Sequence, residues 1–308
     1  MGRDERSVWL DMDPGIDDCW ALIIAAARAR LNGVSAVAGN APLANTYGNA
    51  RKLLQLLGLE PTLALPGAEN PLLGRLISAP DFHGKSGVGD WVNEPVAVPL
   101  DSPRVWDWWI RHHHQLCQCD LIATGPLTNL AVSLLSAPQL GGSWKSVTCM
   151  CGATPGSQVD KAQEFNIYVD PHAADIVFHW MENLRLIGIN VAHRALIPLA
   201  DLPRLRQYGK IGQVLGEMLN FYSRRARGEG GDLEAFPVDD VVAVASAIEP
   251  DLFRWQELPL AVVREGPLRG TVVISPIDLK RKPVKVAVDV DVEGFRHWVW
   301  ESMDFYLG

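Results

Sequence analysis

Four aspartates fall within a stretch of eight residues near the start of the chain, at Asp11, Asp13, Asp17 and Asp18. The apolar run 7–10 before them predicts a short buried strand, and the apolar run 19–30 after them predicts a helix. Pro14-Gly15 interrupts both patterns, so the aspartates lie at a strand-to-helix turn. The fold must therefore tolerate a negatively charged turn at the end of a buried strand.

Carboxylates held this close repel one another, and two physical effects can offset the repulsion. A bound cation neutralises the charge, and a helix N-terminus stabilises part of it. Hard carboxylate oxygens favour Ca²⁺ or Mg²⁺ over Zn²⁺. The alternative is a helix start with solvated aspartates, although ordinary capping uses one acidic side chain, or two in a capping box.

The composition is that of a folded globular protein. The chain has 308 residues, 48% of them hydrophobic and 21% charged, enough for one large α/β domain or two small ones. The net charge of -8 argues against a nucleic-acid partner. Because no apolar run approaches a membrane span and no signal-like segment follows Met1, we expect a cytoplasmic protein without a membrane partner.

The cysteines do not suggest a disulfide framework, because their number is odd and no signal segment precedes them. They lie at Cys19, Cys117, Cys119, Cys149 and Cys151. The two Cys-x-Cys pairs are spaced more tightly than the cysteines of structural zinc sites. We expect the paired cysteines to be buried structural thiols.

Strand-like and helix-like runs alternate through the first two-thirds of the chain. After the first helix we expect strands at 34–38, 62–65, 120–123, 147–150 and 184–188, and helices at 44–57, 105–117 and 171–179. This alternation predicts an α/β fold with a doubly wound, mostly parallel sheet. Ligands of such sheets gather beyond the carboxyl ends of the strands, where the aspartates lie.

The C-terminal part has a different pattern. It predicts antiparallel strands at 260–264, 271–274 and 284–289 and a closing helix at 293–306. Between the two parts we expect a long glycine-containing loop at 79–93, a loose stretch at 224–236 and a helix at 238–248. No linker or repeat separates these parts, so we expect one domain over 1–308, with the strands and helix of 258–308 packed on it.

Other polar residues follow predicted strands or lie in neighbouring loops, in the segments 38–40, 123–131, 150–152, 164–166 and 239–240. Each segment is weak evidence alone, because a lone Asn usually belongs to a turn or a cap. Because these segments share a position beyond strand ends, together they can supply the polar residues that a sugar-binding metal site needs.

Together these blocks resemble the inosine-uridine-type nucleoside hydrolases, which cleave the N-glycosidic bond of ribonucleosides with a bound Ca²⁺. The run 11–18, Asp-Met-Asp-Pro-Gly-Ile-Asp-Asp, is similar to the family's aspartate signature, and blocks at 38–40, 83–84, 124–129 and 164–166 follow in the family's order. The resemblance covers the chain from about residue 7 to the C-terminal helix. It implies a Rossmann-like nucleoside hydrolase fold, a small ribonucleoside substrate and a homodimer or homotetramer.

The resemblance also implies residue roles. Ca²⁺ would bind the side chains of Asp13, Asp18 and Asp240 and the backbone carbonyl of Thr124, and Asp13 would be the general base for a Ca²⁺-activated water. Substrate-binding roles fall to Asp17 and Asn166 at the 2′- and 3′-hydroxyls, Glu164 and Gln158 at the 5′-hydroxyl, Asn40 and Met150 near the anomeric carbon, and Phe165 in the same block. His83 would lie beside the base. A carboxylate-rich pocket suits the positive charge that develops on the sugar.

Two positions depart from the family pattern. The inosine-uridine branch has a histidine directly before the last calcium-binding aspartate, where it helps the base to leave, but this chain has Asp239. Gln158 stands where the family usually has Asn, and its extra methylene can move a hydroxyl contact by about an ångström.

The missing histidine leaves several explanations open. Asp239 could donate the proton itself, held protonated by burial and by Asp240. The base could instead leave with help from stacking on Trp91 or from His83. The chain could also bind a ribosyl compound without cleaving it. A Mg²⁺-dependent phosphatase of the haloacid-dehalogenase type, suggested by Asp11-Met12-Asp13, fits the rest of the turn poorly.

Overall fold

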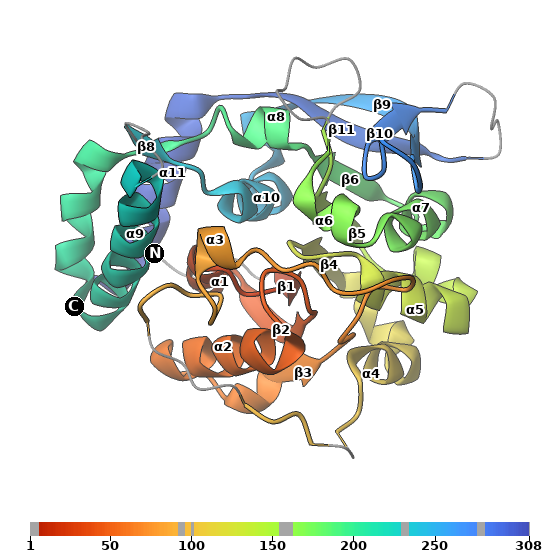
Figure 1. The fold of residues 1–308 in the computed structure, drawn as a ribbon, viewed down its shortest axis with the longest axis horizontal. Coiled ribbons are helices and arrows are strands. Elements are labelled where there is room, and N and C mark those ends of the chain that lie inside the picture. Colours follow the sequence, from red (N-terminus) through yellow and green to blue (C-terminus); the bar gives the residue numbers. More distant parts are fainter. Residues whose placement is uncertain are drawn as a thin grey trace.

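The computed structural model describes residues 6–91, 96–99, 102–153, 163–228, 234–275 and 281–307. Its centre is a nine-stranded sheet in the order β10-β9-β11-β6-β5-β4-β1-β2-β3 (Figure 1). The strands are β1 (Ser7–Met12), β2 (Arg30–Ala36), β3 (Ala64–Pro66), β4 (Cys119–Ala123), β5 (Ser146–Met150), β6 (Leu184–Ile187), β9 (Phe253–Val262), β10 (Val272–Ile274) and β11 (Pro283–Val290). A separate pair joins β7 (Ile197–Pro198) to β8 (Ala235–Phe236).

Most of the sheet is parallel. The neighbours from β3 through β2, β1, β4, β5 and β6 to β11 pair in parallel, whereas β9 pairs antiparallel with β11 and with β10. The α/β class and the mostly parallel, mixed sheet predicted from the sequence are confirmed. The C-terminal antiparallel strands are present too, although β9 begins at Phe253 and so is longer than predicted.

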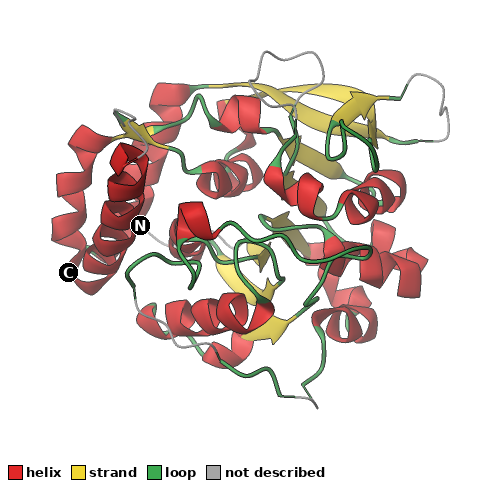
Figure 2. Cartoon of the chain, in the orientation of Figure 1, coloured by secondary structure: helices red, strands yellow, loops and turns green. Residues whose placement is uncertain are grey.

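Helices cover both faces of the sheet (Figure 2). The α-helices are α1 (Ile16–Arg28), α2 (Leu43–Leu56), α3 (Pro80–His83), α4 (Val105–Arg111), α5 (Thr128–Ser136), α6 (Phe165–Val169), α7 (Pro171–Trp180), α8 (Ile189–Ala192), α9 (Gly209–Gly228), α10 (Asp239–Ile248) and α11 (Val292–Met303). The 3₁₀ helices are η1 (Pro61–Leu63), η2 (His113–Gln118), η3 (Pro138–Gly142), η4 (Leu199–Tyr208), η5 (Pro250–Leu252) and η6 (Asp304–Tyr306). None of the described helices combines the length and the apolar character that a bilayer crossing requires.

The first strand shows why the sheet is covered on both faces. Val8, Leu10 and Met12 belong to the core that includes residues of α1, α2, α10 and α11. Trp9 belongs to a second core, with residues of α4, α5 and α7. A parallel strand between two helical layers is apolar on both faces, and this accounts for the continuous apolar run before the aspartates.

Several element boundaries differ from the predicted ones. α1 begins at Ile16 rather than at 19, because the Gly15 N–H donates to Asp18 Oδ2 at 2.8 Å and starts the helix directly after the Pro-Gly break. It ends at Arg28, and Arg30 already belongs to β2. The predicted helix 105–117 is divided between α4 and η2, the predicted strand 62–65 between η1 and β3, and the loop 79–93 contains α3.

Two further expectations were wrong. The stretch from 224, predicted to be loose, is helical as far as Gly228, because it is the end of α9. Cys119, Cys149 and Cys151 are buried as predicted, whereas Cys117 is exposed in η2.

Asn129, in the first turn of α5, forms hydrogen bonds to three separate segments at the carboxyl edge of the sheet. Its Oδ1 accepts the Ala68 N–H at 2.8 Å. Its Nδ2 donates to Asp11 Oδ1 at 2.8 Å and to the Ala36 carbonyl at 3.4 Å. The side chain is fully buried, so removing the amide leaves its partners without a hydrogen bond inside the protein.

We expect Asn129→Ala to lower the free energy of unfolding by about 2–4 kcal/mol, because the Asp11 carboxylate and the Ala68 N–H lose a partner in a buried place. Denaturant unfolding followed by circular dichroism measures this loss. Asn70→Ala, at an exposed asparagine beyond β3, is the control, with an expected change below about 0.5 kcal/mol. Equal losses in the two variants would contradict the role of Asn129.

Candidate functional site

Two adjoining cavities lie beyond the carboxyl ends of the central strands. The first, of about 310 Å³, has polar side chains in its wall, among them Asp17, Asn40, Thr124, Glu164, Asn166 and Asp240. The second, of about 500 Å³, is lined mainly by apolar and aromatic side chains, among them Trp20, Leu219, Tyr222, Phe236 and Val238. Both are lined by Asp17, Phe82, His83, Ile189 and Asp239. Because they share this wall, the pair suits a ligand with a polar part joined to a flat, less polar part.

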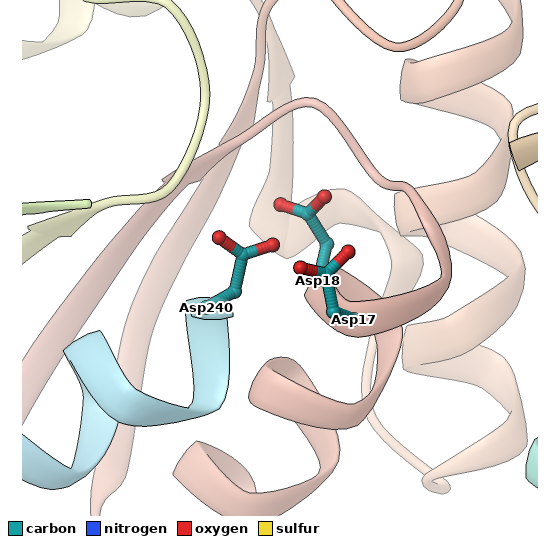
Figure 3. Close-up of side chains that lie close together, drawn as sticks. All are labelled: Asp17, Asp18 and Asp240. Carbon is teal, nitrogen blue, oxygen red and sulfur yellow. The ribbon is translucent and has the colours of Figure 1, made fainter. Parts of the chain in front are cut away.

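Three carboxylates, two of which line the polar cavity, lie close together (Figure 3). Asp17 and Asp18 lie in the first turn of α1, and Asp240 lies in the first turn of α10. One oxygen atom from each lies within 4.8 Å of the others. α1 packs against α10, so two helix N-termini meet at the cluster and their partial positive charge offsets part of the repulsion.

Asp13 lies beside this cluster and is fully buried. Its Oδ2 accepts the Asn40 N–H at 2.7 Å, whereas its Oδ1 has no hydrogen-bond partner among the described residues. A Cβ at Gly39 would lie 2.0 Å from Asp13 Oδ2, and one at Gly125 would lie 2.8 Å from Asp13 Oδ1. The two glycines therefore allow the ends of β2 and β4 to close around the carboxylate.

Asp18 is held by donors from three different parts of the chain. Its Oδ2 accepts the Gly15 N–H at 2.8 Å and the Asn40 Nδ2 at 3.3 Å. Its Oδ1 accepts the Thr124 hydroxyl at 2.7 Å. Since Asn40 also binds Asp13, one asparagine fixes both carboxylates.

The carboxyl groups of this cluster resist ionisation. Burial first, and then repulsion from neighbouring carboxylates, raise the pKa of Asp13 and Asp240 well above the ordinary range and that of Asp17 to about 8. A bound cation opposes both effects. Crowded carboxylates and the unpartnered Asp13 Oδ1 therefore fit a hard divalent cation such as Ca²⁺ or Mg²⁺.

The other side of the polar cavity is formed by α6 and the ends of β4 and β5. Asn166 Nδ2 donates to the Thr124 carbonyl at 2.7 Å and to the Met150 carbonyl at 3.0 Å. Both amide hydrogens are thus engaged, which leaves Asn166 Oδ1 to accept a hydrogen bond from a ligand hydroxyl.

Glu164 caps the N-terminus of α6. Its carboxylate accepts the N–H groups of Asn166 at 2.7 Å, Gly152 at 2.8 Å and Ile167 at 3.1 Å. Burial nevertheless raises the pKa of Glu164 to about 7. The group is therefore fixed in place: Oε2 accepts two of these bonds, and Oε1, which accepts one, keeps acceptor capacity for a ligand hydroxyl.

His83, the last residue of α3, lines both cavities. Its Nδ1 accepts the Ile16 N–H at 3.1 Å, which assigns the ring proton to Nε2. Burial lowers the pKa of His83 to about 4. The neutral ring can donate one hydrogen bond to a ligand at pH 7, but it is not a charged acid.

The structure brings the described site candidates together, although they were identified in separate parts of the sequence. The polar cavity is lined by Asp17, Asn40, His83, Thr124, Met150, Glu164, Phe165, Asn166, Asp239 and Asp240. Asp13 and Asp18 are buried directly behind it and bind Asn40. Gln158 lies outside the described residues. Trp91 packs partly buried against the core and lines neither cavity, so the structure does not place it against a base.

Sequence reasoning missed His193, a titratable side chain at the site. It follows α8, which begins two residues after the end of β6, and it lines the larger cavity. Its Nε2 lies 3.3 Å from Asp239 Oδ2. The only available signal was its position shortly after a predicted strand. Tyr222 and Phe236 of the same cavity were missed as well, because they lie in α9 and β8, for which no element was predicted.

Comparison with known proteins gives one consistent result. Residues 8–297 match the family described as inosine-uridine preferring nucleoside hydrolase. The chain is similar to the pyrimidine-specific ribonucleoside hydrolase RihA of Klebsiella pneumoniae, with 33% identity over 306 residues, 97% of this chain and 98% of the relative.

Two solved structures are similar over nearly the whole fold. A purine-preferring ribonucleoside hydrolase from Gardnerella vaginalis has a TM-score of 0.89 at 26% identity, covering 98% of this chain and 99% of the other. The plant nucleoside hydrolase PpNRh1 has a TM-score of 0.87 at 27% identity, covering 97% and 99%. The fold implied by the sequence resemblance is confirmed, and this chain belongs to the inosine-uridine preferring nucleoside hydrolase family.

Proposed function

We propose that the protein hydrolyses the N-glycosidic bond of purine or pyrimidine ribonucleosides, releasing ribose and the free base, with Ca²⁺ as its cofactor. The observation that carries this proposal is the junction of a carboxylate-rich cavity with an apolar, partly aromatic one. A ribose and a base joined by one bond have the same division of chemistry. The family match favours this reaction over the phosphatase alternative.

The proposed calcium ligands are the side chains of Asp13, Asp18 and Asp240 and the carbonyl oxygen of Thr124. Their hard oxygen atoms and raised pKa values suit a divalent cation, which makes a water more acidic when bound. Asp13 is the proposed general base, because its unpartnered Oδ1 is free to take a proton. The Asn40 N–H bond to Oδ2 and the close backbone at Gly39 and Gly125 fix the position of the carboxylate.

The ribose is proposed to bind in the polar cavity. Asp17 and Asn166 Oδ1 accept hydrogen bonds from the 2′- and 3′-hydroxyls, and Glu164 takes the 5′-hydroxyl, with Asn40, Met150 and Phe165 completing the cavity wall. Gln158, from the family resemblance alone, is proposed to assist Glu164 at the 5′-hydroxyl. Hydroxyls buried without such acceptors would be costly. The same carboxylates stabilise the positive charge that develops on the sugar as the base leaves.

A second candidate function is ribosyl binding without cleavage. It is favoured by a single observation, the aspartate at 239 where the inosine-uridine branch has a histidine. The cytoplasmic location, the single domain and the homodimer or homotetramer stay predictions.

The first test is ribose release from inosine, adenosine, guanosine, uridine and cytidine. We expect release that a chelator abolishes and added Ca²⁺ restores, because the carboxylate cluster needs the cation. A reducing-sugar assay measures the reaction, and the ranking of the bases gives the specificity. If no nucleoside is cleaved while the folded protein binds Ca²⁺ by titration calorimetry, the binding function replaces the hydrolase.

Asp13→Ala should lower kcat by roughly a thousandfold or more and weaken Ca²⁺ binding, because it removes both the proposed base and a ligand. Asp251→Ala is the matched control, since Asp251 is exposed just beyond the opposite end of α10 from Asp240. Full activity in a folded Asp13→Ala variant would remove Asp13 from the mechanism.

Gly39→Ala tests the close approach to Asp13. Its Cβ would collide with Asp13 Oδ2, so we expect a displaced carboxylate and a loss of about 100-fold in kcat/KM. Gly216→Ala in α9 should leave kcat/KM unchanged, because a Cβ there meets nothing within 4 Å. Steady-state kinetics with saturating Ca²⁺ measures both. Unchanged kinetics in Gly39→Ala would show that the position of Asp13 is not critical.

A further inference from the structure

Asp239, the residue before the proposed calcium ligand Asp240, has a histidine side chain beside it. His193 Nε2 lies 3.3 Å from Asp239 Oδ2, so an imidazole from α8's C-terminal end stands against this position. The other oxygen of Asp239, Oδ1, is buried and has no hydrogen-bond partner in the described part of the chain. Within that part, His193 is therefore the side chain that orients the Asp239 carboxylate.

His193 lies at the larger cavity, in which the base is proposed to bind. It lines the larger, apolar cavity and not the polar one, whereas Asp239 lines both. With the ribose in the polar cavity, the glycosidic bond lies near the shared wall and the base extends toward His193. About half of the His193 side chain, 53%, stays exposed, so its proton can be replaced from water after each turnover.

The electrostatic surroundings favour a charged imidazole. The hydrogen bond to Asp239 raises the pKa of His193 above its ordinary value, and the charges of Asp239 and Asp17 add to the effect, while partial burial opposes it. The other titratable or charged groups nearby are His83 on α3, Tyr222 on α9, and Arg194, which is paired with Asp289 on β11. His83 is neutral at pH 7 for the reasons given above.

We propose that His193, oriented by Asp239, is the general acid that protonates the departing base. This rests on the proposed hydrolase function. Asp239 occupies Nε2, so the proton comes from Nδ1–H. The C1′–N bond breaks and its electron pair stays with the base, which takes the proton from His193. Water adds to C1′ and gives its proton to Asp13. His193 ends neutral and Asp13 protonated, and both exchange with solvent.

The test compares two leaving groups in the Ca²⁺-loaded protein. A nucleoside base needs a proton to leave, whereas para-nitrophenolate leaves from para-nitrophenyl β-ribofuranoside without one. We expect His193→Gln to lower kcat/KM for the nucleosides about 100-fold and to change that for the nitrophenyl riboside less than about threefold. His114→Gln, at an exposed histidine in η2, is the matched control and should change neither.

The pH profile provides a second readout. Activity on nucleosides should fall as the pH rises through the pKa of His193, because the proton is then lost, and this limb should disappear in His193→Gln. Asp239→Asn, which keeps the side chain's shape, should move the limb to lower pH, since the charge that raises the pKa of His193 is gone.

The outcomes separate the two proposals. Equal losses on both substrates, or no loss on either, would overturn the role of His193 and leave the hydrolase function standing. Wild-type protein that cleaves neither substrate would overturn the hydrolase function and with it the role of His193. Circular dichroism and Ca²⁺ titration confirm that each variant is folded and loaded.

Discussion

The repulsion among carboxylates at the ends of β1, α1 and α10 is the constraint on which the rest of the site depends. Burial increases the cost of each charge, and each neighbour increases it again. The chain offsets part of that cost with two helix N-termini and with donors placed on Asp18 and Asp13. The protein alone does not balance the remaining negative charge of the carboxylate cluster, so the cluster favours binding of a cation.

A second layer of hydrogen bonds holds this arrangement rigid. Asn129 joins Asp11 to the neighbouring strand ends, and Asp170 accepts from the Thr128 hydroxyl and the Leu72 N–H while it caps α7. Gly39 and Gly125 then allow the backbone to close on Asp13. The positions of the proposed base and cation ligands thus depend in part on residues that line neither cavity.

Much of the sheet and of the polar cavity could be predicted from the sequence, because the patterns that indicate them each lie within a few consecutive residues. The aspartates, the glycine-containing turns and the strand-end asparagines are each encoded within a few residues, and a parallel sheet brings strand ends to one edge. α9 was missed although Val214, Leu215, Met218 and Leu219 are buried at helical spacing, since Gly212 and Gly216 weaken its pattern. His193 was missed because only the packing of α8 on α10 places it beside Asp239.

The site also draws its two acidic helix starts from distant parts of the chain, with β2 to β6 of the sheet between them in sequence. During synthesis from the N-terminus, the turn that carries Asp17 and Asp18 is complete long before Asp240 exists. A half-made chain therefore has an acidic turn without its third carboxylate and without the second helix N-terminus. The proposed cation site is therefore incomplete until α10 docks on α1, so tight binding of a cation would report the packing of these two helices and not the folding of the first turn alone.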